Sequence, residues 1–260
     1  MILHFLFLFV AGIAGGLLAT IAGLASIATY PALLIVGIPP VVANVSNTVS
    51  LISTGIGAIP SSLKELHGQW HRVLGYTTLA VIGSLVGSSL LLVAPAATFE
   101  KIVPFFILSA GIMLISSGRG TESKTSAKLK EHIKNPKKDH WIKLASYTGI
   151  VFVGAYLGYF GAAGGVVLLA ILGIITHESF AEYNAVKNVI AFACNIAATL
   201  LFIFNATIAW AAVVPLGLGL LIGGYSGPII VRHINVKVLR TIIAIASFAL
   251  AGQLFFKAYL

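Results

Sequence analysis

Long apolar runs without a charged residue constrain this chain more than any other feature. Residues 73–93 and 102–115 are two such runs. A lipid bilayer cannot satisfy backbone N–H and C=O groups, so the segments that cross it form helices or a closed β-barrel. Barrel strands alternate apolar and polar residues over about 10 positions, whereas these runs are continuously apolar. The sequence therefore predicts an all-α polytopic membrane protein.

The composition supports the same fold class. The chain has 260 residues, of which 58% are hydrophobic and 9% are charged. A soluble domain carries about 25% charged residues, so this chain has too few to cover a water-facing surface. The N-terminal stretch MILHFLFLFV lacks the basic residues of a signal peptide, and we expect it to begin the first span. The expected location is the cell membrane, with several passes; in a bacterium this is the inner membrane.

The apolar runs predict about eight transmembrane helices, at residues 4–24, 43–60, 73–94, 102–118, 145–163, 184–204, 209–230 and 241–258. Two shorter apolar pieces, 26–37 and 164–175, each follow a glycine cluster. At 1.5 Å per residue, both pieces are too short to cross about 30 Å of hydrocarbon. Because glycine permits breaks and tight turns, we expect re-entrant or broken helices at both places.

The two halves of the chain resemble each other, which predicts a tandem duplication. The first repeat is 1–118, the second is 145–260, and a basic linker loop, 119–144, joins them. The matching positions are Trp70 with Trp210, Gly83 and Gly87 with Gly223 and Gly227, Gly23 with Gly164, and Asn47 with Asn188. We interpret the spaced glycine pairs as surfaces on which helices pack closely.

The basic loops bear on how the repeats are oriented. Loops 61–72, 119–143 and 231–240 are rich in Lys and Arg, which favours the cytoplasmic side. Eight plain spans would leave 231–240 outside. If each short apolar piece adds a crossing or a re-entrant leg, each half has an odd number of legs. All three loops then lie inside and the repeats are inverted, as in many transporters. The alternative is a parallel repeat in which one loop violates the rule.

Each half contains one stretch rich in amides and hydroxyls: ANVSNTVSLIST at 43–54 and YNAVKNVIAFACN at 183–195. On a helix, most of these polar residues share one face, and such a face in a membrane contacts protein or water. We predict substrate-binding roles for Asn44, Asn47, Thr48, Asn184, Lys187 and Asn188, and backbone anion contacts at the helix breaks for Gly23, Gly161, Gly164 and Gly165. The alternative is hydrogen bonding between helices without a ligand, which we favour for the serines of the first stretch.

Lys187 is the most informative polar residue. Apart from Lys257 near the end of the sequence, it is the only Lys or Arg inside a predicted span. We expect it in the first turn of its helix, where the helix dipole disfavours a cation unless an anion lies beside it. The alternative is that its amine extends to the lipid headgroups.

Several classes of function are not supported. None of the seven Asp and Glu residues lies in the middle of a predicted span, whereas cation sites and proton relays normally use carboxylates. The single cysteine, Cys194, excludes a multi-cysteine metal site. Neither a nucleophile elbow nor a P-loop is present. We therefore expect no enzyme activity, metal or cofactor. Most of the net charge of +9 lies in one loop, so nucleic acid is not an expected partner.

The stretch GLASIATYPALLIVGIPPVVANVSNTVSLISTGIG resembles the first half of the TauE/SafE sulfite exporter family, also called the domain-of-unknown-function 81 family. The second half adds GAAGG, AVKNVI, Trp210 and the pair Gly223 and Gly227. This resemblance, which covers nearly the whole chain, implies a transporter of small sulfur-containing or organic anions such as sulfite and sulfonates.

Our leading hypothesis is secondary transport of such an anion by alternating access. An anion channel or uniporter and a non-transporting scaffold subunit are the alternatives. Protons are candidate coupling partners, carried either by the substrate or by Lys187, and a homo-oligomer is a candidate assembly.

Overall fold

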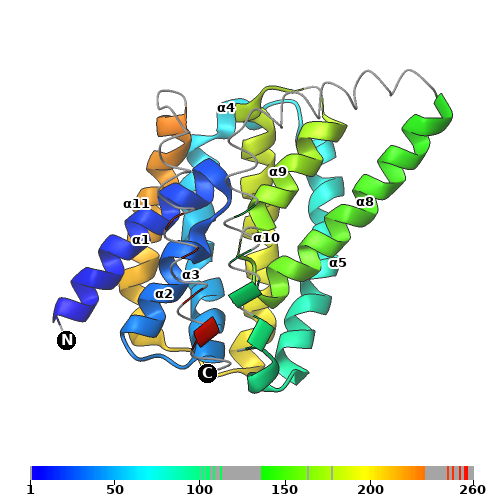
Figure 1. The fold of residues 1–260 in the computed structure, drawn as a ribbon. Helices are drawn as coiled ribbons and strands as arrows, with labels where there is room; N and C mark the ends of the chain where they lie inside the picture. The colour runs from blue at the N-terminus through cyan, green and yellow to red at the C-terminus, as the bar shows by residue number, and fades with distance from the viewer. Residues whose placement is uncertain are drawn as a thin grey trace.

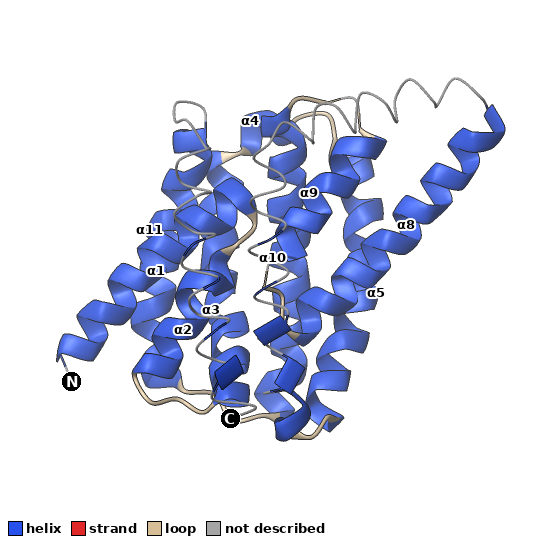
Figure 2. Ribbon diagram, viewed as in Figure 1, coloured by secondary structure: helices blue, strands red, loops and turns tan. Residues whose placement is uncertain are grey.

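The computed structural model describes residues 2–99, 136–162, 164–176 and 178–231, together with scattered positions within 101–112 and 245–256. Every regular element in this part of the chain is a helix (Figure 2). The long helices are α1 (Ile2–Ala22), α3 (Pro40–Ser61), α5 (Trp70–Val93), α8 (Pro136–Tyr159), α10 (Phe180–Asn205) and α11 (Trp210–Val231). The short helices are α2 (Ala25–Ile35), α4 (Leu63–Leu66) and α9 (Gly164–Ile175).

Among the described residues, five helices are long and apolar enough to cross a membrane: α1, α3, α5, α10 and α11. In α8 the apolar part is the shorter segment Leu144–Tyr159. The all-α polytopic membrane class is therefore confirmed. The number of eight spans stays a prediction, since the expected spans 102–118 and 241–258 lie largely outside the described residues.

Two helices extend further toward the N-terminus than the sequence predicted. Within the described residues, helix α8 spans Pro136–Tyr159, so residues 136–144, which we expected in the linker, are helical. Hydropathy locates the apolar part of a helix rather than its full length. Helix α10 begins at Phe180 instead of residue 184. Its start is set by a capping box in which Ser179 and Glu182 bond each other's backbone N–H.

The two short apolar pieces form separate helices, α2 and α9, as the glycine clusters predicted. The residues that open the breaks are Gly23, with φ of 73°, and Gly161, with φ of 72°. Both values lie in the left-handed region, which glycine adopts without steric cost. The chain therefore reverses after α1 and again after α8.

The helices run in opposite directions in the two parts of the chain (Figure 1). Helix α1 runs toward the end of the molecule where α4 lies, and α2 returns from that end. Helix α8 runs away from that end, and α9 returns toward it. Likewise, α3 and α11 run toward it, while α5 and α10 run away. Helix α1 packs on α11, and α8 packs on α5.

Glycines bring the outer helix pairs into backbone contact. A Cβ atom added to Gly83 or Gly87 of α5 would overlap carbonyl oxygens of α8, and one added to Gly223 of α11 would overlap that of Ile13 in α1. At Gly227 the added atom would overlap the Thr20 hydroxyl. The predicted packing role of these four glycines is confirmed. Such close approach is how helices associate in lipid, where no hydrophobic force drives them together.

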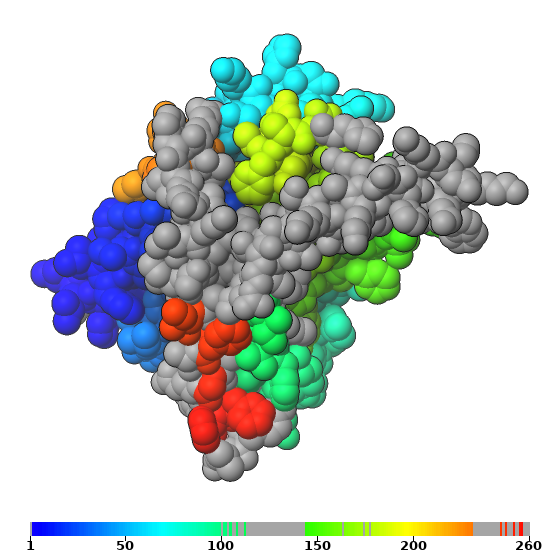
Figure 3. Space-filling view, turned by 45° about the horizontal axis from the view of Figure 1, so that its top comes forward, coloured from blue at the N-terminus to red at the C-terminus, as the bar shows by residue number. Residues whose placement is uncertain are grey.

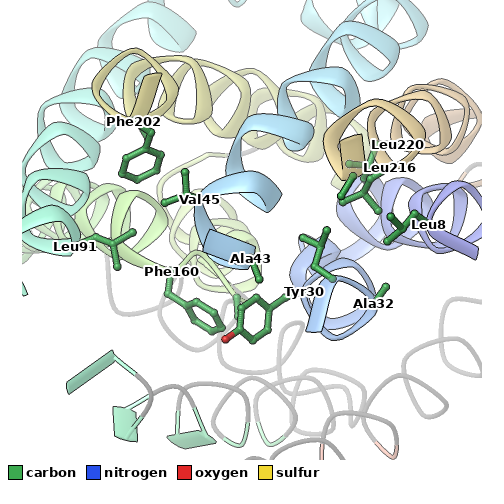
Figure 4. Packing of buried hydrophobic residues seen from close by; sticks show 14 of the residues in the cluster. Leu8, Tyr30, Ala32, Ala43, Val45, Leu91, Phe160, Phe202, Leu216 and Leu220 are labelled. Carbon is green, nitrogen blue, oxygen red and sulfur yellow. The ribbon is translucent and has the colours of Figure 1, made fainter. Parts of the chain in front are cut away.

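The exterior and the interior are both apolar, as expected for a protein in lipid. The first turns of α1 project from one side (Figure 3), where Ile2 is 84% and Leu3 is 75% exposed. Inside, Tyr30 and Phe160 lie next to each other (Figure 4). Their ring centroids are 5.3 Å apart in an edge-to-face arrangement, and Phe99 packs on Phe160 at 5.5 Å. Because Phe160 directly precedes Gly161, this aromatic group lies beside the second helix break.

Candidate functional site

Helices α3 and α10, which carry the two polar stretches, contact each other in the interior. Between them and the two helix breaks lies a cavity of about 60 Å³. A single water needs roughly 15 Å³ of such space, so the cavity has room for several waters or a small polyatomic ion. Its polar lining comes from Ser26, Thr48, Thr54, Lys187, Asn188 and Asn195. Leu51, Leu157, Phe160, Ala191 and Phe192 contribute apolar walls.

The two helix breaks meet at this cavity. A Cβ atom on Gly23 would lie 2.5 Å from the Gly165 Cα, so the two backbones are in direct contact. Of the four glycines predicted at the breaks, Gly23, Gly161 and Gly165 line the cavity. Gly164 does not, since its Cα faces the side chains of Leu157 and Tyr156.

The beginnings of two helices also border the cavity. Ala25 and Ser26 open α2, and Gly165 lies in the first turn of α9. Helix α2 has no side-chain hydrogen bond that caps its N-terminus. The first N–H groups of a helix carry partial positive charge and bind anions. This part of the wall therefore suits a negatively charged ligand.

The Lys187 side chain lies inside the protein and is 1% exposed. Its Nζ donates to the carbonyl oxygens of Ala19 at 2.7 Å and Thr20 at 3.3 Å. These carbonyls belong to the last turn of α1, where the partial charge is negative and favours a cation. Our expectation that Lys187 occupies the first turn of its helix was wrong, because α10 begins earlier, at Phe180. Its amine also does not extend to the exterior.

The ammonium of Lys187 is only partly satisfied by these two carbonyls. It has three N–H donors, and no described residue accepts the third, although Lys187 lines the cavity. Within the described part of the chain, the one ion pair joins Arg72 to Glu178, at 2.8 Å. Lys187 therefore has no carboxylate partner among those residues.

Asn44 and Asn184 brace helix ends and do not line the cavity. The Asn44 Nδ2 donates to the carbonyl of Tyr159, at the end of α8, at 2.8 Å. The Asn184 Nδ2 donates to the carbonyl of Thr20, at the end of α1, at the same distance. Each amide thus satisfies a backbone acceptor that the helix break leaves open.

Asn47 also lies outside the cavity wall. Its Nδ2 donates to the Ser26 hydroxyl at 3.0 Å, and its Oδ1 accepts from the Thr29 hydroxyl at 2.5 Å. Thr48 does line the cavity, with its hydroxyl donating to the Asn44 carbonyl at 3.1 Å. The predicted site residues therefore separate into two groups, of which Thr48, Lys187 and Asn188 reach the cavity.

Two polar groups in the wall have no hydrogen-bond partner among the described residues: the Nδ2 of Asn188 and the hydroxyl of Thr54. A buried polar group without a partner costs about 1–3 kcal/mol, which a ligand in the cavity would offset. Thr54 and Asn195 are the last residues of the two polar stretches, and they were not predicted as site residues. The helical spacing that places them on the polar faces of the two helices is the signal that identifies them.

The fold and this cavity define a helical membrane protein that spans the bilayer several times and encloses a polar site between broken helices. The description "Sulfite exporter TauE/SafE" belongs to the family that matches residues 8–254. The chain belongs to this family, which confirms the resemblance seen in the sequence.

Relatives agree with this assignment. A "Probable membrane transporter protein ORF9" of Sinorhizobium sp is 24% identical over 250 residues, covering 95% of this chain and 91% of the relative. A "Probable membrane transporter protein" of Haemophilus influenzae is 23% identical, covering 95% and 92%. "Probable membrane transporter protein YfcA" of Escherichia coli K12 is 23% identical, covering 97% and 90%. No solved structure matches. The protein is a multi-pass membrane transporter of the cell membrane.

Proposed function

We propose that this protein is a secondary transporter that moves a small sulfur-containing or organic anion, of the sulfite or sulfonate type, by alternating access. The observation that carries the proposal is the cavity at the meeting point of the two helix breaks, with the amine of Lys187 in its wall. The sulfur chemistry rests on the description of the family.

The donors in the cavity wall favour an anion over a cation. The third N–H of Lys187, the Nδ2 of Asn188 and the hydroxyl of Thr54 can all donate, and none has an acceptor among the described residues. No carboxylate is among the described residues that line the cavity. Hydrogen bonds between charged partners are about twice as strong as neutral ones, so an anion gains most from the ammonium.

An inverted repeat is part of the proposal, because alternating access in many carriers depends on one. It is supported by the opposite directions of α1 and α8, and of α3 and α10 (Figure 1). Gly23 and Gly161 share a left-handed conformation, which pairs them as equivalents in place of Gly23 and Gly164. The cavity then lies between the two repeats, where the sites of such carriers are found.

Cysteine labelling at the two ends of the molecule tests this arrangement. Helix α4, the start of α8 and the end of α11 lie at one end (Figure 1), and the basic loops attach there. In a Cys194→Ser background, we expect Leu63→Cys and Asn235→Cys to react with a membrane-impermeant thiol reagent from the cytoplasmic side. Asn205→Cys, at the opposite end, is expected to react from outside. Labelling of the first two from opposite sides would exclude the inverted arrangement.

The function itself is tested with purified protein in liposomes. We expect sulfite or a sulfonate to raise the melting temperature, since a ligand at 100 times its Kd stabilises a protein by about 2.7 kcal/mol. We also expect accumulation of the anion against its own gradient when a proton gradient is imposed. Equilibration without accumulation would indicate a channel, and neither stabilisation nor flux would indicate a scaffold.

We further propose that the substrate carries the coupling proton. Sulfite exists in two protonation states near neutral pH, so its transport should change with pH. A sulfonate stays ionised there, and its transport should not. A strong proton-gradient dependence for the sulfonate would assign the proton to the protein instead, with Lys187 as the candidate carrier.

A further inference from the structure

We propose that Phe192 of α10, seated on Gly55 of α3, sets the largest anion that the transporter accepts. This inference rests on the proposed function of the cavity, because both residues line it. It adds a size determinant to the polar groups that select for charge.

The ring of Phe192 lies directly on the backbone of α3. A Cβ atom added to Gly55 would lie 2.5 Å from the Cγ of Phe192 and 2.6 Å from its Cβ. Side-chain atoms essentially never approach so closely, so only glycine at position 55 admits the ring in this place. The two helices therefore approach closely at the boundary of the cavity.

Helix α3 is held in place on its other side, where it packs against α11. A Cβ atom on Gly57 would lie 2.7 Å from the Tyr225 backbone N, and one on Gly224 would lie 2.5 Å from the Thr54 carbonyl oxygen. A close-packed interior relaxes only partly when a side chain is shortened. Removing the ring of Phe192 should therefore enlarge the cavity instead of letting the helices close over it.

The ring lies one helical turn beyond the unpartnered amide. Phe192 follows Asn188 by four residues, and one turn of an α-helix rises about 5.4 Å. Gly55 likewise follows Thr54 directly in α3. An anion whose charged group binds Lys187 and Asn188 would thus direct its substituent toward Phe192.

The other aromatic wall differs from Phe192. Phe160 is held edge-to-face between Tyr30 and Phe99, with centroid distances of 5.3 and 5.5 Å. Phe192 has no aromatic neighbour among the described residues, and its position depends on Gly55. Phe192 is therefore the wall residue that can be changed without disturbing a cluster of rings.

The test compares two sulfonates that share a charged group and differ in size, methanesulfonate and benzenesulfonate. Their Kd values are measured by ligand-dependent stabilisation of the purified full-length protein. We expect the wild type to prefer methanesulfonate, and Phe192→Ala to raise the relative affinity for benzenesulfonate at least tenfold. Phe192→Leu should give an intermediate ratio. Transport of both anions in liposomes should follow the same order.

Phe202→Ala is the matched control. Phe202 lies on the same helix, is fully buried in a hydrophobic cluster and does not line the cavity, so its loss should lower stability but leave the ratio unchanged. An unchanged ratio in both Phe192 variants, with methanesulfonate still bound, would overturn the size role and leave the proposed function intact. Failure of the wild type to bind any of sulfite, methanesulfonate and benzenesulfonate would instead refute the proposed function and this inference with it.

Discussion

The polar stretches of α3 and α10 carry similar residues at matching positions, yet they use them differently. Asn44 and Asn184 stand at the same spacing as Trp70 and Trp210, and each bonds the end of a broken helix. Three residues further along the same face, this spacing pairs Asn47 of α3 with Lys187 of α10, one residue before the Asn188 to which the sequence comparison matched it.

That difference determines which stretch supplies the charge. Asn47 bonds two hydroxyls of α2, the helix that precedes its own, and both ends of its amide are occupied. Lys187 bonds the end of α1 and retains a donor for the cavity. Matching positions can thus share a structural task while only one of them contributes to binding.

The largest effect is expected from removing the cation of the described cavity wall, Lys187. Lys187→Met keeps a long side chain but removes the charge. A hydrogen bond to a charged group is worth about 1.5–3 kcal/mol, so we expect anion affinity to fall by roughly 10- to 150-fold. The measurement is the shift in melting temperature as a function of anion concentration.

Asn184→Ala is the control for Lys187→Met. It removes a bond to the same Thr20 carbonyl without touching the cavity wall. Both variants should melt at lower temperature, but only Lys187→Met should lose the response to the anion. If both variants lost the response to the anion equally, Lys187 would act only by holding the end of α1.

The second prediction compares the two bracing amides. Asn44→Ala removes the hydrogen bond to the Tyr159 carbonyl, and such a bond is worth about 0.5–1.5 kcal/mol. Asn184→Ala should cost less, because the Thr20 carbonyl still accepts from Lys187. Melting temperatures without ligand give the comparison. A greater loss of stability for Asn184→Ala would show that Lys187 does not compensate for the missing amide at the Thr20 carbonyl.

The smallest expected effect concerns the amide that lines the cavity. Asn188→Ala removes one neutral donor, worth about 0.5–1.5 kcal/mol, so anion affinity should fall by roughly 2- to 10-fold. Asn47→Ala should leave the affinity unchanged while lowering stability, because Asn47 lies outside the cavity wall. Calorimetric titration with sulfite distinguishes the two. If both variants lost the same anion affinity, Asn47 would belong to the binding site after all.

Much of the fold could be predicted from hydropathy, because lipid permits few alternatives to the helix. The breaks at Gly23 and Gly161 were also predictable, since short apolar pieces followed glycine clusters. The helical conformation of residues 136–144 was not, because helical hydrogen bonds continue into a polar segment that hydropathy assigns to a loop.

The site could be predicted only as a set of candidates. Helical spacing places Asn44, Asn47 and Thr48 on one face, but it does not say what lies opposite each of them. Asn44 meets the end of α8, Asn47 meets hydroxyls of α2, and Thr48 meets the cavity. These differences arise from helices that are distant in the sequence, so no local pattern encodes them.

Each half of the chain supplies an asparagine that bonds a helix end of the other half. This exchange has a consequence for how the protein is synthesised. Asn184 and the Thr20 carbonyl that it satisfies are 164 residues apart, and Asn44 and Tyr159 are 115 apart. At a synthesis rate of about 5–20 residues per second, the end of α1 waits roughly 8–30 s for its partner to leave the ribosome. During that interval its carbonyls depend on water or on the insertion machinery. Expressed alone, the first half would lack this partner and should be degraded rapidly, and co-expression of the second half should protect it from proteolysis.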